Sequence, residues 1–159
     1  MSDSDALYRD LKADLRALAD PLLQFAQQQV QKRGMFLPFG ATLRPGGEVS
    51  LSAAWTGKER VSSAELLPLL HEGLRADAVQ SKAFAIGVCE WVKITPAGGS
   101  QTDAIKVLVE HARGLTVAFY MPCQKPLLRG WQFGNVMALA AEPEVRPWNA
   151  PGVTQTDNG

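Results

Sequence analysis

Cysteine and histidine are scarce in this sequence, with only two of each among 159 residues. Cys89 and Cys123 are too few to form the disulfide framework of a small secreted domain, so we expect a reduced, cytoplasmic setting. His71 and His111 do not occur with other ligands at the short spacings that zinc sites use. A nucleophilic pair of Cys123 with a histidine would require the last segment to fold back over the thiol. The sequence thus predicts no metal site and no cofactor.

An excess of charge of either sign is also missing, because sixteen Lys and Arg balance sixteen Asp and Glu. A general nucleic-acid binder needs a basic excess or a concentrated basic stripe, and neither is present, so we expect no nucleic-acid partner. No apolar run approaches the ~20 residues that a membrane-spanning helix needs. The acidic first residues lack the layout of a signal peptide. We therefore expect no membrane partner.

Short motifs for catalysis or nucleotide binding are absent from the sequence. It contains no Gly-x-Ser-x-Gly elbow, no His-Glu-x-x-His helix, no Gly-x-Gly-x-x-Gly and no Walker loop. Gly46 and Gly47 are followed by an extended apolar segment and not by a helix, which indicates a hairpin turn and not a phosphate loop. The sequence predicts no catalytic residue, and an enzyme is the less favoured class.

Apolar residues at three- to five-residue spacing predict helix in the first part of the chain. They are Leu7, Leu11, Leu15, Leu18, Leu22, Phe25 and Val30. Pro21 leaves two alternatives: two helices, over 4–19 and from Pro21 onward, or one kinked helix. Gly34 is a typical C-terminal stop. A further helix is expected after Ser62, because Glu65 stands at the capping-box spacing.

Alternating apolar residues predict five extended segments that pair as antiparallel hairpins. A three-residue turn at 45–47 makes Leu43 face Val49 and Ala41 face Leu51. The later segments are expected to pair about the turns at 112–114 and 96–102. The expected facing pairs there are Val109 with Val117, Val107 with Phe119, Val92 with Ile105, and Val88 with Val109.

These elements predict an α+β fold, with N-terminal helices and one middle helix packed on an antiparallel sheet of five or six strands. The expected order is α-β-β-α-β-β-β. Residues 1–148 are expected to form a single domain, and residues 149–159 a flexible C-terminal tail. Within 124–148 the signals weaken, and one more strand or a short helix fits them equally.

Glu90 is the candidate for ligand binding or acid/base chemistry. In the expected register it lies between Val88 and Val92, on a face that should be core and roughly opposite Val107. A buried carboxylate needs a partner or a raised pKa. The alternative interpretation is that a bulge brings Glu90 to solvent, or that a nearby Lys or Arg pairs with it.

The second face of the later sheet is the candidate interaction surface. Trp91, Lys106 and Tyr120 are expected to form one row on it, with Leu108 beside them. This face is too apolar for plain solvent surface. Either helices or the C-terminal segment cover it, or it is an interaction patch, where aromatic residues beside a cation are typical hot spots.

The runs FLPFGA, RPGGEV and TDAIKVLVEH resemble a group of small bacterial proteins, over most of residues 22–123. That resemblance implies no particular activity and no catalytic residue. The order of elements also resembles the roadblock and profilin-like layout, whose members are often dimeric binding platforms. We therefore expect a non-catalytic protein-binding or accessory module that binds a protein partner or forms a homodimer. The alternatives are a small-ligand protein or enzyme with a pocket near Glu90, and an immunity- or chaperone-like protein that binds a co-encoded partner.

Overall fold

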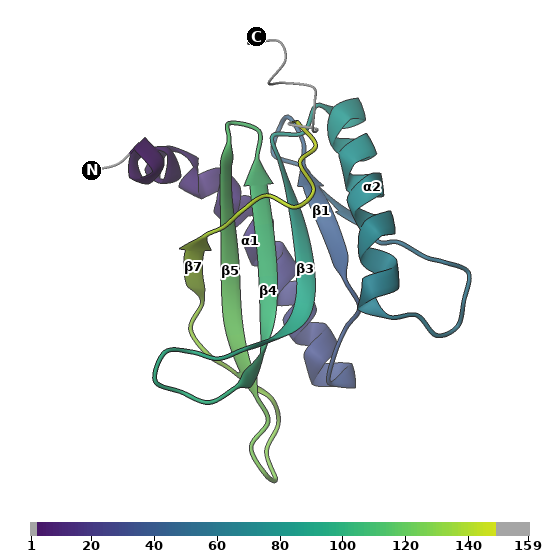
Figure 1. Ribbon diagram of the computed structural model, residues 1–159, viewed down its shortest axis with the longest axis vertical. Coiled ribbons are helices and arrows are strands. Elements are labelled where there is room, and N and C mark those ends of the chain that lie inside the picture. Colours follow the sequence, from purple (N-terminus) through teal and green to yellow (C-terminus); the bar gives the residue numbers. More distant parts are fainter. Residues whose placement is uncertain (1–2, 149–159) are drawn as a thin grey trace.

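The computed structural model describes residues 3–148 and contains two helices and an antiparallel sheet (Figure 1). The elements are α1 (Asp3–Arg33), β1 (Phe39–Leu43), β2 (Val49–Ser52), α2 (Ser63–Ser81), β3 (Ala85–Ile94), β4 (Thr102–His111), β5 (Leu115–Gln124), β6 (Gln132–Phe133) and β7 (Met137–Ala140). The α+β class and the order α-β-β-α-β-β-β are confirmed, and β6 and β7 are short additional strands. The expected flexible tail lies outside the described residues.

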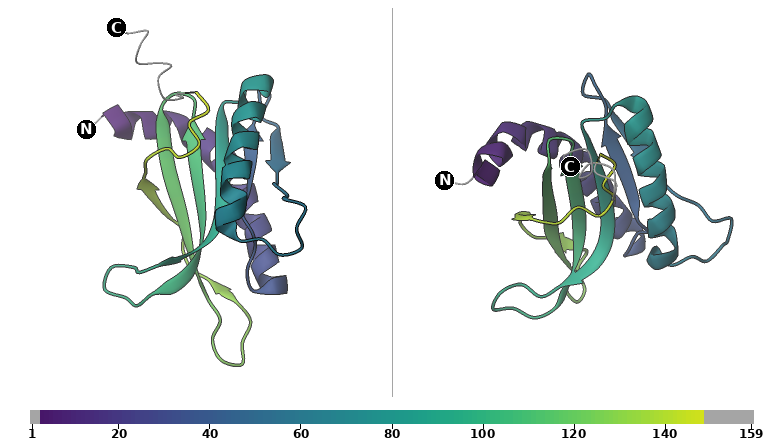
Figure 2. Two further views of the ribbon diagram at one scale, coloured as in Figure 1. Left: turned by 45° about the vertical axis from the view of Figure 1, so that its right-hand side comes forward. Right: turned by 45° about the horizontal axis from the view of Figure 1, so that its top comes forward.

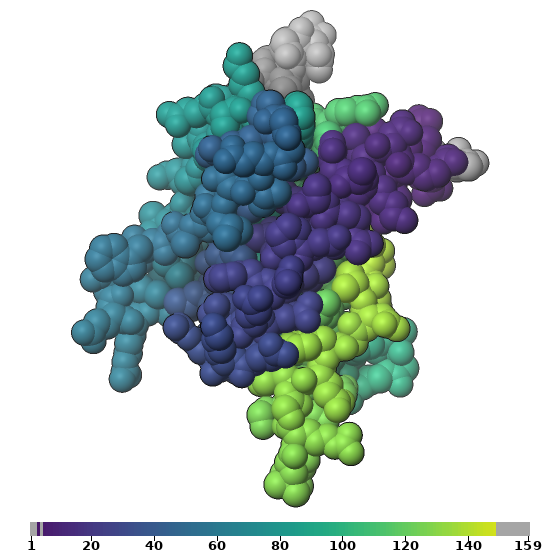
Figure 3. All heavy atoms as spheres, turned by 180° about the vertical axis from the view of Figure 1, so that it is seen from behind, coloured from purple at the N-terminus to yellow at the C-terminus, as the bar shows by residue number. Residues whose placement is uncertain are grey.

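The sheet has the order β2-β1-β3-β4-β5-β6, with β7 pairing along another part of β5. The strand β2 therefore forms one edge, while β6 and β7 form the other. Helix α1 crosses one face of the sheet diagonally (Figure 3), and α2 packs on the opposite face over β1 and β3 (Figure 2). We call these the α1 face and the α2 face.

The single-helix alternative is the one that this protein adopts, because α1 continues through Pro21. Pro21 lies on an exposed side of the helix. A proline inside a helix removes one backbone hydrogen bond. Figures 1 and 2 show that α1 changes direction along its length. The apolar stripe is buried on the α1 face, except Leu7, which is partly buried, and Phe25, which is 39% exposed.

The two short-turn hairpins have the expected registers. Leu43 pairs with Val49 in the first hairpin, and Val109 pairs with Val117 between β4 and β5. The expected register of β3 with β4 is wrong by one residue: Val92 pairs with Ala104 and not with Ile105. Likewise, Val88 pairs with Leu108 and not with Val109. A one-residue slip turns every side chain to the other face, so this correction reassigns the candidate surface.

Two glycines allow the helices to approach the sheet closely from opposite sides. A Cβ added to Gly87 would lie 2.8 Å from Leu22 Cδ1 of α1. A Cβ added to Gly40 would lie 2.8 Å from Leu74 Cδ1 of α2 and 2.6 Å from the Gly87 carbonyl oxygen. Any larger residue would push the packed layers apart, since protein interiors leave few voids.

Residues 141–148 form an irregular segment, which we call the strap, that crosses the α2 face (Figure 1). The carboxylate of Glu110, on β4, holds it: Oε2 accepts the N–H groups of Glu144 (2.9 Å) and Val145 (2.7 Å), and Oε1 accepts that of Arg146 (2.8 Å). Arg75 Nε donates to the Val145 carbonyl at 2.8 Å. The strap is thus tied to both β4 and α2.

Candidate functional site

The candidate row of Trp91, Lys106 and Tyr120 does not exist as one row. Trp91 pairs with Ile105 and lies on the α1 face, because of the slip between β3 and β4. Its ring packs against Phe36 and Trp131, with ring centroids 5.9 and 5.7 Å apart. Trp91 is therefore partly buried in an aromatic cluster and shares no face with Lys106.

Glu90, Lys106 and Tyr120 do form one row, on the α2 face. Glu90 pairs with Lys106, Lys106 pairs with Tyr120, and Tyr120 pairs with Met137 of β7 at the edge. All three are partly buried. Leu108 shares this face but is only 1% exposed, so it belongs to the core. That any of these residues binds a partner stays a prediction.

The surroundings of Glu90 match the interpretation in which a cation lies nearby. Burial raises the pKa of Glu90, Lys106 opposes that shift, and Glu144 on the strap adds to it. Lys106 Nζ lies 3.5 Å from Glu144 Oε2. Glu144 also acts on His71 of α2, whose pKa is lowered mainly by burial. The row thus joins a small charged cluster where β3, β4, α2 and the strap meet.

This cluster has limited chemical capacity. The Nε2 atom of His71 is buried without a hydrogen-bond partner. However, among residues 3–148 no three His, Cys, Asp or Glu side chains come together in a way that could hold a metal ion. An isolated carboxylate with a raised pKa can exchange a proton, but a general acid or base also needs a substrate positioned beside it.

Neither thiol is paired with a histidine. Cys89 Sγ donates to the Leu22 carbonyl at 3.9 Å and Cys123 Sγ to the Met121 carbonyl at 3.3 Å. Burial raises the pKa of both thiols, that of Cys123 to about 11, so neither is an activated nucleophile. His111 is engaged elsewhere, with its Nε2 atom 2.8 Å from Asp14 Oδ2 of α1.

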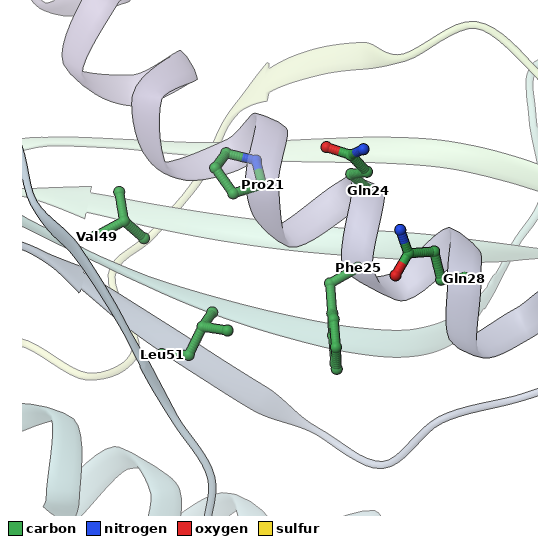
Figure 4. Close-up of a pocket in the computed structure, with 6 residues that line it drawn as sticks. All are labelled: Pro21, Gln24, Phe25, Gln28, Val49 and Leu51. Carbon is green, nitrogen blue, oxygen red and sulfur yellow. The ribbon is translucent and has the colours of Figure 1, made fainter.

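A hollow of about 410 Å³ between α1 and β2 was not foreseen from the sequence (Figure 4). Its lining has no charged side chain and consists of Pro21, Gln24, Phe25, Gln28, Val49 and Leu51. Phe25 is 39% exposed and Leu51 is 56% exposed. The sequence pattern places both residues on apolar faces. It does not show that β2 is an edge strand, and it is this edge position that leaves both side chains partly exposed.

The open edge of β2 adjoins this hollow. Arg44 N donates to the Glu48 carbonyl at 2.8 Å, so Arg44 and Glu48 form a hydrogen-bonded pair. Because such pairs alternate along an antiparallel ladder, the backbone N–H and C=O groups of Ser50 also point toward β1. The N–H and C=O groups of Val49 and Leu51 therefore point away from the sheet. No other strand of the described part of the chain pairs with β2 on that side. The strand contains no Lys or Pro that would protect its edge.

Comparison of the chain with protein-family models, with curated proteins and with solved structures finds no significant match. The resemblances noted from the sequence therefore stay predictions. Neither α1 nor α2, the helices of residues 3–148, combines the length and the apolar content that crossing a bilayer would take.

Proposed function

We propose that this protein is a non-catalytic protein-binding module that self-associates through the edge strand β2. One observation carries the proposal: an unprotected sheet edge lies beside an uncharged, largely apolar hollow. An added strand would bond to the edge, while its alternate side chains would enter the hollow. The sequence prediction of self-association is kept, but the proposed contact moves from Trp91 to β2. The cytoplasmic setting stays a prediction.

A second copy fits this edge because β2 is self-complementary about a two-fold axis. An antiparallel pairing centred on Ser50 places Val49 opposite Leu51 of the partner subunit, and the reverse. Every outward N–H and C=O group of Val49 and Leu51 then acquires a partner. Glu48 comes opposite Ser52 of the partner subunit, so no like charges face each other across the junction.

The side chains support the same pairing. Val49 and Leu51 point to the α1 face, because they pair with Leu43 and Ala41, which lie in the core under α1. Two copies related by the axis would bring their hollows together, so each Leu51 and Phe25 would be covered. Complete burial of a fully exposed leucine contributes about 1.5–3 kcal/mol, and Leu51, which is 56% exposed, can gain only part of that. This burial adds to the backbone pairing of two short strands.

Light scattering of the purified protein tests the association. We expect a dimer for the wild type and a monomer for Leu51→Lys, because the charge would enter an apolar junction. The matched control is Leu139→Lys: Leu139 is 55% exposed on β7, at the opposite edge. The control is expected to remain dimeric. A wild-type monomer at high concentration would overturn the proposal, and dissociation by the control alone would exclude β2 as the contact.

Disulfide cross-linking tests the register. Ser50 and its copy would form a non-hydrogen-bonded pair, with Cα atoms about 4.5 Å apart, within the range that a disulfide spans. Ser50→Cys is therefore expected to cross-link under oxidation. Ser52→Cys is the matched control and is expected to remain uncross-linked, because its partner would be Glu48. Cross-linking of Ser52→Cys alone would reject the register.

The two alternatives have less support. The first alternative is a small-ligand protein or enzyme in which Glu90 binds the ligand or acts as acid or base. Burial alone explains the raised pKa of Glu90, and Lys106, its partner across β3 and β4, already supplies a positive charge, so no ligand is needed to explain either feature. For an immunity- or chaperone-like protein, a co-encoded partner would compete for the same edge. Such a partner would bind the wild type but not Leu51→Lys, and the wild type alone would then be monomeric.

A further inference from the structure

The tip of the hairpin between β5 and β6 exposes two leucines almost completely. Leu127 is 89% exposed and Leu128 is 95% exposed. Figure 3 shows this segment protruding beyond the end of α1, and Figure 1 shows it below the sheet. Isolated exposed apolar residues are ordinary, but two adjacent leucines at the end of a projecting loop are concentrated where a partner can reach them.

The backbone of the tip is also unusual, because Leu128 has a φ of +63°. This left-handed conformation is unfavourable for a leucine and is normally occupied by Gly or Asn. The turn places a large apolar side chain where a glycine would be less strained. Lys82 and Arg146 also have positive φ, so the conformation of Leu128 supports a functional role only together with the exposure of its side chain.

Basic residues lie on either side of the leucines in the sequence and also line a hollow next to the same hairpin. Lys125 and Arg129 flank them in the sequence, and a hollow of about 500 Å³ beside the tip is lined by Lys32, Arg33, Lys125 and Trp131, among others. The chain has no Asp or Glu from Pro21 to Gly47 or from His111 to Ala141. In the described part of the chain, none of the ion pairs involves any of these four cations. No carboxylate of residues 3–148 therefore forms a direct ion pair with Lys32, Arg33, Lys125 or Arg129.

The hairpin is anchored, so the leucines cannot turn inward without breaking packed contacts. Trp131 packs edge-on against Trp91, and β6 pairs with the end of β5 through Cys123 and Phe133. Within the tip, Lys125 Nζ donates to the Arg129 carbonyl at 3.3 Å. The projecting conformation is thus supported from both sides.

We propose that this tip binds the surface of bilayers that carry anionic headgroups. Leu127 and Leu128 enter the boundary of the acyl chains, and the surrounding Lys and Arg contact the headgroups. Apolar residues at the tip with basic residues on either side match the apolar acyl layer and the anionic headgroup layer of such a surface. A protein groove is the less favoured occupant, since leucine is under-represented among interface hot spots. The proposal departs from the sequence expectation of no membrane partner, which rested on the lack of a membrane-spanning run and of a signal-peptide layout; binding to a bilayer surface requires neither.

Co-sedimentation of the full chain with lipid vesicles tests the proposal. We expect binding to vesicles of phosphatidylcholine mixed with phosphatidylglycerol, weakening with added salt, and little binding to phosphatidylcholine alone. Leu127→Ser is expected to weaken binding on the order of tenfold, because it removes one inserted apolar side chain. Leu139→Ser is the matched control and is expected to bind as the wild type does.

Leu128→Gly separates the binding role from a structural one. It removes the side chain and relieves the positive φ, so we expect weaker vesicle binding together with a higher melting temperature. Three results would overturn the proposal: no binding to anionic vesicles, equal binding to neutral ones, or undiminished binding by both leucine variants. Because the tip and β2 are separate, these results do not depend on whether the protein dimerises.

Discussion

Replacing Glu110 by glutamine is expected to loosen the strap. Glu110 is 2% exposed, and its carboxylate accepts three consecutive backbone N–H groups. Hydrogen bonds to a charged group contribute about 1.5–3 kcal/mol each, against about 0.5–1.5 kcal/mol for neutral ones. In Glu110→Gln an amide NH₂ replaces one oxygen, so at least one backbone donor faces another donor. The least disruptive orientation of the glutamine amide places its NH₂ group at the position of Oε1, where it loses the hydrogen bond from Arg146 N. The amide oxygen then keeps the hydrogen bonds from Glu144 N and Val145 N, now to a neutral acceptor.

The expected loss in free energy of unfolding is about 2–4 kcal/mol, because the lost and weakened bonds are partly offset by burial of a neutral group. For a chain of this size that corresponds to a melting temperature lower by about 4–16 °C. Thermal unfolding followed by circular dichroism measures the total effect. Hydrogen exchange at the amides of Glu144, Val145 and Arg146 measures the local one, and we expect it to accelerate.

Glu142→Gln is the control, because Glu142 lies on the same strap but is exposed. It is expected to change stability by less than about 0.5 kcal/mol. Melting of Glu110→Gln at the wild-type temperature, with its strap amides exchanging at the wild-type rate, would contradict this role of Glu110. In that case the carboxylate would not hold the strap, and the Arg75 hydrogen bond together with the burial of Val145 would have to account for its position.

Gly87→Ala is expected to cost about 1–3 kcal/mol in chemical denaturation, since the new Cβ would press on Leu22; an unchanged midpoint would contradict the close packing of α1. Cys89 and Cys123 are expected to resist a thiol reagent at neutral pH until the chain unfolds, because burial raises both pKa values; rapid labelling of the native protein would mean that the core opens. Burial raises the pKa of Glu90, so the native state binds its proton more readily than the unfolded chain, and stability falls as pH rises through the carboxyl range. Glu90→Gln is therefore expected to raise the melting temperature at neutral pH and to lose this advantage in acid, whereas equal melting at neutral pH would argue against a desolvated carboxylate.

The features that could be predicted from the sequence are those set by local chemistry. The loops at 45–47 and 112–114 are short enough to fix the pairing of the strands they join. Ser62 and Glu65 form the expected reciprocal capping box, with each side chain bonded to the backbone of the other residue. In each case the interacting residues are near one another in the chain.

The register of β3 could not be predicted because both of its faces are buried. Ile86 and Val88 meet α2, while Cys89 and Trp91 lie on the α1 face. Apolar residues therefore occupy successive positions, and their alternation does not select one register over its neighbour. The longer turn before β4 gives no independent constraint. Because of this ambiguity, the sequence pattern places Trp91 on the wrong face of the sheet.

The interactions of Glu110 and the tip could not be derived from local patterns either. The three donors to Glu110 lie at least 34 residues further along the chain, and strand alternation contains no information about them. The basic hollow beside the tip combines the end of α1 with the β5–β6 hairpin, which only the folded sheet brings together.

Helix α1 precedes in the chain all the strands that it covers, and this order has a consequence for biosynthesis. Its buried side chains pack against β4 and β5, which are translated only after α2 and β3. At about 5–20 residues per second, a ribosome needs several seconds to reach those strands after it completes the helix. During that interval β1 and β3 can already pack on the helix, but the part of the leucine stripe that β4 and β5 cover stays exposed on the nascent chain. Exposed apolar surface of this kind favours aggregation before folding is complete.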